Sequence, residues 1–346
     1  GVRMAAPSSR RFRLRDSSRS RRRLRCHWPR WTLVALATWI AVDQTRRHLI
    51  GPVDRPQPAV PFVLHFESST GSSWLMELLG ARPDACVVGF EPIDNITMSS
   101  PADHAARIRW LRTLWSPSAT SVEAWESWQQ QLLRASVFGQ RHVIRTSLHR
   151  CSRQRARAFG LKARLSRLLS HPTSVPALAA LMRGSGARML RLSRRNRIKQ
   201  AMAEYNRLHA GRGQFVAAAT YTSNASRPRP ASVHVHLDRF RQALRAVERS
   251  HRLSTRLLEA LEGVAVLHID YEDLLGDTER TMTAVANFLE LQTAGLAPPA
   301  TRLLKATPDH LCSAVKNYRQ VCSAYLNTEY ERFFDAPTGQ CACGRS

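Results

Sequence analysis

The sequence predicts an α/β fold of three layers, in which helices cover both faces of a central, mostly parallel β-sheet. The main observation is an alternation along the chain: short apolar runs, typical of buried strands, are separated by longer segments of helical periodicity. With 346 residues, of which 43% are hydrophobic and 23% charged, the chain has the length and composition of a globular protein with a sizeable core. The sequence has no internal repeat of fixed period, so a repeat architecture is not expected.

The first strand, loop and helix are the clearest elements. Residues 61–66 form an apolar run bounded by a turn signal and predict a buried strand. Residues 67–71 are small and polar and predict a loop, while 72–80 has a serine cap candidate, apolar spacing and a terminal glycine, which predict a helix. Further strands are expected at 86–90, 142–145, 158–162, 188–192 and 264–269. Further helices are expected at 104–115, 121–136, 196–210, 237–262, 278–290 and 308–326, and a loop at 211–230.

Charge is unevenly distributed along the chain. Lys and Arg number 52 against 26 Asp and Glu, which gives a formal net charge of +26. Residues 1–50 contain 13 basic and 2 acidic side chains, and residues 141–212 contain 18 basic side chains and one acid, Glu204. Because the rest of the chain is close to neutral, the basic internal segment indicates an anionic ligand as much as a nucleic acid.

Composition divides the chain into four regions: a basic tail at 1–50, a proline-rich linker at 51–61, one globular domain at 62–335 and a C-terminal tail at 336–346. Within the first tail, residues 31–42 form an apolar stretch of 12 residues, shorter than the roughly 20 of a spanning helix. We interpret it as a signal-anchor that leaves the domain in a secretory lumen. The alternatives are an Arg-rich organelle transit peptide and a merely disordered tail.

The seven cysteines do not have the spacing of zinc ligands. Cys341 and Cys343 form one close pair without a second pair or a nearby histidine, so no metal site is expected. Cys312 and Cys322 are ten residues apart and could bridge two turns in an oxidising lumen, an option that the sequence leaves open.

The strand, loop and helix at 62–80 carry the predicted chemistry. A loop that leads into a helix N-terminus offers free backbone N–H groups and the positive end of the helix dipole, and both favour a phosphate. Serine and threonine hydroxyls add donors, and Gly71 lets the backbone approach a ligand closely. The pattern GxxxxGK[ST] is absent, so ATP or GTP hydrolysis is disfavoured. The alternative interpretation is a plain strand-to-helix turn.

The run Ser-Thr-Gly-Ser-Ser-Trp-Leu at 69–75 resembles the 5′-phosphosulfate-binding loop of sulfotransferases. Four later segments resemble the family in the same order along the chain: 83–92, 192–198, 271–289 and 307–318. The resemblance spans 61–335 and is greatest to the carbohydrate, bacterial trehalose-type and algal enzymes. It implies the P-loop-like sulfotransferase fold.

The resemblance also implies an activity and a set of site residues. The enzyme would transfer a sulfuryl group from 3′-phosphoadenosine 5′-phosphosulfate to an acceptor hydroxyl of a carbohydrate, without a metal ion. The apolar stretch 31–42 would place it in the lumen of the Golgi or another secretory compartment, where sugar acceptors occur. Glu91 matches the carboxylate that takes the proton of the acceptor, with Glu67 as an alternative and His65 or His104 as further candidates. Residues that would bind the donor are Ser69, Thr70, Gly71, Ser72, Ser73, Trp74 and, at the 3′-phosphate, Arg195. For Trp74, packing in the core is the alternative role.

Two positions depart from the pattern of the family. Ser69 stands where the loop normally has Lys or Arg, and Ala203 stands where a Ser normally follows the 3′-phosphate arginine by eight residues. Either another cation, Lys162 or Lys199, compensates, or the protein is a catalytically degenerate homologue.

A different class of function is a basic nucleic-acid-binding protein that uses residues 141–212. That segment contains only Phe159 and Tyr205 as aromatic side chains, so platforms for base stacking are scarce. No zinc-finger or RNA-recognition signature is present. We therefore expect no specific nucleic-acid partner.

Overall fold

The computed structural model describes residues 59–88, 91, 101–115, 156–209, 232–293, 310–335 and 340–342. The chain divides into two units, Gly1–Arg55 and Pro56–Ser346, and every described residue lies in the second. Several predicted segments lie outside the described residues, namely the apolar stretch 31–42, the helix at 121–136 and the strand at 142–145. None of the helices in the described ranges is long and apolar enough to cross a membrane.

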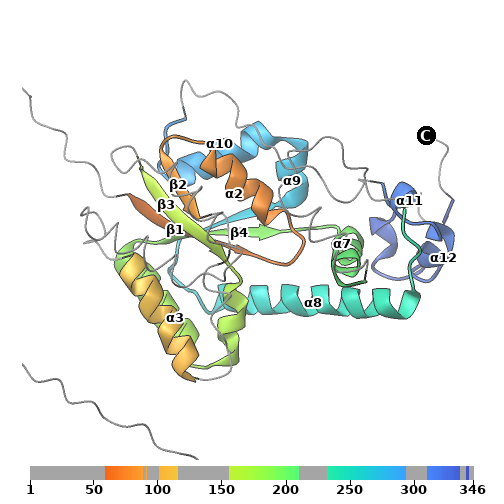
Figure 1. Ribbon diagram of the computed structural model, residues 1–346, viewed down its shortest axis with the longest axis horizontal. Coiled ribbons are helices and arrows are strands. Elements are labelled where there is room, and N and C mark those ends of the chain that lie inside the picture. Colours follow the sequence, from red (N-terminus) through yellow and green to blue (C-terminus); the bar gives the residue numbers. More distant parts are fainter. Residues whose placement is uncertain are drawn as a thin grey trace, which may run out of the picture. The chain divides into compact units, whose positions relative to one another are not determined.

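The described strands form a parallel sheet in the order β2-β3-β1-β4-β5 (Figure 1). Their bounds are β1 Val60–Phe66, β2 Ala85–Val88, β3 Ala158–Ala163, β4 Arg188–Ser193 and β5 Val266–Asp270. The register places Val63 of β1 opposite Leu161 of β3 and Met189 of β4. An almost continuous apolar run such as β1 suits a central strand that is buried on both faces.

One face of the sheet is covered by three helices, which pack on the side chains of Phe62, Leu64 and Leu190 (Figure 1). These helices are α2 (Ser72–Gly80), α9 (Tyr271–Gly276) and α10 (Thr278–Phe288). The apolar residues of α10, including Met282, Val285 and Ala286, face this layer, as the spacing of one helix face requires.

The other face packs its side chains, among them Val63, Leu161 and Met189, against a second helical layer. That layer consists of α3 (Pro101–Leu114), the 3₁₀ helix η2 (Leu165–Ser170), α6 (Ser174–Ser185) and the C-terminal part of α8 (Leu237–Glu259). The two covered faces confirm the prediction of a three-layer α/β fold.

A third apolar cluster lies around the N-terminal half of α8, where Phe240 is fully buried between the rings of Tyr205 and Tyr325. It contains α7 (Arg197–His209), α11 (Leu311–Ala314), α12 (Tyr318–Ser323) and the 3₁₀ helix η3 (Glu331–Phe333). The prediction of one helix over 308–326 is wrong. Val315 is extended and forms a β-bridge with Val233, which separates α11 from α12.

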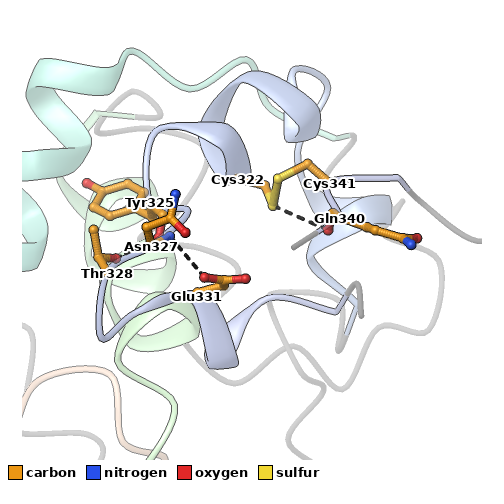
Figure 2. Close-up of a disulfide and its surroundings, with 7 residues drawn as sticks. All are labelled: Cys322, Tyr325, Asn327, Thr328, Glu331, Gln340 and Cys341. Atoms are coloured by element: carbon orange, nitrogen blue, oxygen red, sulfur yellow. Dashed lines mark hydrogen bonds between the residues drawn. A yellow bond between two sulfur atoms is a disulfide. The ribbon is translucent and has the colours of Figure 1, made fainter. Parts of the chain in front are cut away.

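A disulfide ties the end of the chain to this cluster (Figure 2). Cys322 of α12 is bonded to Cys341, so a bridge between Cys312 and Cys322 is excluded. Cys86 and Cys312 each take part in a further disulfide. Cys341 packs against the apolar cluster, and it thereby fastens part of the predicted C-terminal tail to the domain.

Candidate functional site

The topology of the sheet makes the carboxyl end of β1 the candidate position for a ligand. From β1 the chain continues to β2 and β3 on one side, and then crosses to β4 and β5 on the other. In open parallel sheets, ligands bind outside the carboxyl ends of the strands at such a switch point. The loop 67–71 follows β1 directly, so the loop predicted to bind a phosphate lies at this position.

The backbone of the loop leaves the start of α2 open. Gly71 is the N-cap residue, with φ 80°, and no side chain caps the helix, so Ser72 is its first residue and not its cap. The first backbone N–H groups of a helix have no acceptor within the helix, and here they have no capping side chain either. Gly71 is also required by packing, because a Cβ atom there would lie 2.7 Å from Cδ2 and Cε2 of Tyr271.

The hydroxyl groups of the loop have different surroundings. Thr70 is buried and its hydroxyl donates to the carbonyl oxygen of Glu67 at 2.8 Å, which closes the loop on itself. The Oγ of Ser73 accepts a hydrogen bond from Nζ of Lys162 at 2.9 Å. Ser69 is half-buried and has φ 62°, in the left-handed region, while Ser72 is buried.

Trp74 packs edge-on against the ring of Tyr271, with ring centroids 6.0 Å apart, and borders the apolar cluster on this face of the sheet. Its Nε1 atom is buried and has no hydrogen-bond partner in the described part of the chain. Trp74 therefore has the core contacts that the alternative interpretation expects, together with one unused donor beside the loop.

Glu91, the predicted base, lies between two cations at the end of β3. Its Oε1 is 3.3 Å from Nζ of Lys162, and its Oε2 is 3.4 Å from Nη2 of Arg164. The side chain of Lys162 is 6% exposed and that of Glu91 is 24% exposed, so the carboxylate remains open to solvent while its partner is buried. Because Lys162 contacts both Ser73 and Glu91, the structure brings the predicted base to the predicted ligand loop.

Two neighbouring arginines at the end of β4 point to different partners. Nη1 of Arg194 donates to the carbonyl oxygen of Ser69 at 3.4 Å, and its guanidinium lies over the ring of Tyr271. Burial lowers the pKa of Arg194, and Tyr271 and Glu272 partly oppose this effect.

Arg195, the residue predicted to hold the 3′-phosphate, is half exposed and forms a two-point ion pair with Asp273, at 2.5 Å and 3.2 Å. Asp270 lies 3.5 Å from the same guanidinium. In this structure it is Arg194 that contacts the loop, and Arg195 stands beside it among carboxylates.

Glu67 is the centre of a buried polar cluster at the base of the loop. Its Oε2 accepts from Arg197 at 3.1 Å and from Gln200 at 3.4 Å, and its Oε1 is 3.0 Å from Nδ1 of His251. Gln200 also donates to the carbonyl oxygen of Ser68 at 2.9 Å. Burial alone would raise the pKa of Glu67, but the hydrogen bond from His251 and the charge of Arg197 together lower it below its usual value. Glu67 is thus a carboxylate that holds the loop, and both of its oxygens are engaged.

The two histidine candidates lie on the face of the sheet opposite α2, His65 on strand β1 and His104 on helix α3. His65 is fully buried, its Nε2 lies 2.9 Å from Oγ of Ser254, and the backbone N–H of Leu165 donates to its Nδ1. Burial lowers the pKa of His65 to about 4. His104 is buried in α3, with its ring 5.1 Å from that of His171. An acceptor in the crevice has no access to a buried ring of this kind.

Sequence reasoning underrated the cations of this site. Lys162 and Arg164 are two residues apart at the end of a strand, so their side chains lie on the same face, and this spacing was the available signal. For Arg194, which follows β4, the choice between it and Arg195 depends on how the turn bends. Among the described residues no group of three or more His, Cys, Asp or Glu could hold a metal ion.

No protein-family model matches the sequence, and no curated protein is significantly similar to it. Solved structures do match. A sulfotransferase from Alicyclobacillus acidocaldarius is 18% identical, with 74% of this chain and 88% of that chain covered and a TM-score of 0.38. The sulfotransferase domain of the Synechococcus PCC 7002 olefin synthase is 16% identical, with 72% and 81% covered and a TM-score of 0.34. The sulfotransferase domain from the curacin biosynthetic pathway is 14% identical, with 75% and 83% covered and a TM-score of 0.35. All three carry the name of the family that the sequence motifs resemble, while the fold class of this chain follows from its own parallel sheet and two helical layers.

Proposed function

We propose that this protein is a sulfotransferase that moves a sulfuryl group from 3′-phosphoadenosine 5′-phosphosulfate to an acceptor hydroxyl. The observation that carries the proposal is the loop 67–71, which enters the uncapped helix α2 at the switch point of the sheet with Lys162 and Arg194 in contact with it. Amide donors at the positive end of a helix, hydroxyls and two cations suit a dense polyanion better than any neutral ligand.

The donor set fits a phosphosulfate despite the missing basic residue at position 69. Lys162 reaches the loop from β3 and supplies a positive charge there through its hydrogen bond to Ser73. At the 3′-phosphate, the resemblance assigns Arg195, whose ion pair with Asp273 is exposed. An exposed ion pair of this kind contributes only about 0.2–1 kcal/mol to stability, so a phosphate can compete with Asp273 for the guanidinium of Arg195.

In the proposed reaction Glu91 is the general base. As the oxygen of the acceptor hydroxyl bonds to sulfur, its proton passes to the carboxylate of Glu91. The bond between sulfur and the phosphate oxygen of the donor breaks, which leaves adenosine 3′,5′-bisphosphate. Arg164 holds one oxygen of Glu91 and so fixes the direction of the carboxylate, while the charge of Lys162 favours the negative oxygens of the transferred group.

We further propose a carbohydrate acceptor and a lumenal location in the Golgi or another secretory compartment, with 31–42 as the membrane anchor. The acceptor is supported by the motifs shared with carbohydrate sulfotransferases. The location is supported by the disulfide between Cys322 and Cys341, because disulfides persist in oxidising compartments. Import into an organelle by a transit peptide is the alternative.

The proposal is tested by thermal unfolding with adenosine 3′,5′-bisphosphate, the product of the donor. A ligand that binds only the folded state at 100 times its Kd stabilises it by about 2.7 kcal/mol. We expect this stabilisation in the parent protein and a smaller one in Lys162→Ala and Arg195→Ala, with Arg319→Ala, an exposed arginine of α12, as the control. The absence of any shift at millimolar ligand, in a folded sample, would contradict the proposed function. So would steeply salt-dependent binding of bulk DNA with which the bisphosphate does not compete.

A further inference from the structure

Helix α8 carries a row of arginines on the side that faces away from the domain. We call this row the arginine stripe; its members are Arg241, Arg245, Arg249, Arg252 and Arg256. Spacings of three and four residues place side chains on one face of a helix, and all five of these are exposed. At 1.5 Å per residue the stripe is about 22 Å long.

The stripe is held rigidly because the opposite face of α8 is buried. Phe240, Leu244 and Val247 pack in the apolar cluster around α7 and α12, and Leu257 packs under the sheet. The Cα atoms of the arginines therefore keep a fixed spacing along the helix, so binding a ligand does not have to order the backbone.

The charge of the stripe is little compensated within the described residues. Arg241 pairs with Asp238 at 3.0 Å, whereas the other four arginines have no ion pair in the part of the chain that the structure describes. Two further acids of the helix, Glu248 and Glu259, lie at the flank and at the end of the stripe. Like charges at i and i+4 destabilise a helix, so the arrangement is unfavourable for the fold alone.

We propose that the arginine stripe binds an acidic polysaccharide, a linear chain that carries sulfate or carboxylate groups. A straight row of planar guanidinium groups matches anionic groups repeated along an extended chain, and each arginine can form two parallel hydrogen bonds to a sulfate or carboxylate.

Two observations favour a polysaccharide over a nucleic acid. The one aromatic residue of α8, Phe240, is fully buried, so the helix offers no platform on which a base could stack. The disulfide between Cys322 and Cys341 also supports the proposed secretory location, in which acidic polysaccharides and not nucleic acids would be the available linear polyanions.

The stripe lies on the helix that also supports the candidate active site. His251, on another side of α8, is 3.0 Å from Glu67 at the base of the loop. A polysaccharide held on α8 is therefore kept at a raised local concentration near the crevice. This consequence for acceptor supply rests on the proposed function, whereas binding to the stripe does not.

The experiment compares two variants of equal charge in the full chain. The stripe variant replaces Arg245, Arg249, Arg252 and Arg256 with glutamine. The control variant replaces four exposed arginines on α3, α12 and η3, namely Arg109, Arg112, Arg319 and Arg332. The measured quantity is the affinity for a heparin hexasaccharide as a function of salt, without any nucleotide present.

We expect the stripe variant to bind at least about tenfold more weakly than the control variant and to have a shallower salt dependence, since it has lost four defined anion contacts. Equal losses in both variants would overturn the proposal in favour of attraction by net charge. Single-stranded DNA that displaces the hexasaccharide at equal charge would assign the stripe to nucleic acid instead.

A second measurement covers the case in which the stripe variant does not fold. In the unmodified protein, the hexasaccharide should protect the stripe arginines from modification by phenylglyoxal and leave Arg319 and Arg332 reactive. Equal reactivity of both groups would overturn the proposal. If the hexasaccharide binds to the stripe but the bisphosphate does not stabilise the protein, the proposal for the stripe holds and only the proposed function is contradicted.

Discussion

Replacing Gly71 with alanine changes the loop at its most constrained position. The residue has φ 80°, and a Cβ atom would lie 2.7 Å from two carbon atoms of the Tyr271 ring, closer than real side chains approach. That ring cannot move freely, because it is buried and held by the edge of Trp74 and by the guanidinium of Arg194.

The cost of Gly71→Ala has two parts. The left-handed backbone costs alanine about 1–2 kcal/mol. Overpacking against a well-held ring costs about 1–3 kcal/mol more. Gly186→Ala is the matched control, because Gly186 has φ 66° but nothing within 4 Å of its Cβ position, so only the backbone cost applies. The difference between the two variants isolates the contact with Tyr271.

Urea unfolding of the two variants measures this difference. We expect the free energy of unfolding to fall by about 1–2 kcal/mol in Gly186→Ala and by about 2–5 kcal/mol in Gly71→Ala. Thermal shifts with adenosine 3′,5′-bisphosphate should be normal in Gly186→Ala and much reduced in Gly71→Ala, since the loop amides are displaced. Equal stability of both variants, together with equal ligand shifts, would refute the reasoning.

Three further predictions concern the base, a buried histidine and the disulfide. Glu91→Gln should lower sulfuryl-transfer turnover by about 10²–10⁴ and leave the stabilisation by bisphosphate unchanged. Glu67→Gln should instead weaken both the stability of the fold and the binding of bisphosphate. A fully active Glu91→Gln would exclude Glu91 as the base. Burial lowers the pKa of His65 to about 4 in the folded state, against 6.5 when unfolded, so the unfolded chain binds the extra proton as the pH falls. The free energy of unfolding in urea should therefore fall by about 3 kcal/mol between pH 7 and pH 4. His65→Gln should flatten this pH dependence, and an unchanged slope would contradict the reasoning. Cys341→Ser opens a loop with a sequence separation of 19, which should cost about 3 kcal/mol in calorimetry, and a variant as stable as the parent would show that the bridge does not contribute.

The strands could be predicted because their sequence pattern is local and strong. The run at 61–66 is apolar on both faces, and the observed strand, Val60–Phe66, differs from it by one residue. Helix α6 was missed, since Gly184 and Gly186 obscured its end and Pro176 lies inside its first turn, where proline is tolerated. In the structure Gly186 ends this helix in the left-handed conformation.

Tertiary contacts decided what the sequence pattern alone could not. The periodicity of 308–326 suits one helix, but Val315 pairs its backbone with Val233, which lies 82 residues earlier in the chain. Likewise, Thr70 was a candidate donor to the ligand, and only the fold shows that its hydroxyl is committed to the carbonyl of Glu67. Neither fact is contained in a local window of sequence, because each depends on a partner fixed by the path of the chain.

The contacts around position 69 help to distinguish an active ligand site from that of a catalytically degenerate homologue. Ser69 keeps φ 62° and Gly71 keeps φ 80°, conformations that a plain turn into a capped helix does not need. Lys162 is buried, a costly position for a cation, yet it contacts both the loop and Glu91. An uncapped helix, a left-handed Ser69 and a buried lysine each cost stability. Their coincidence at the switch point of the sheet supports the proposed transferase, in which Lys162 of β3 would supply the positive charge that position 69 lacks.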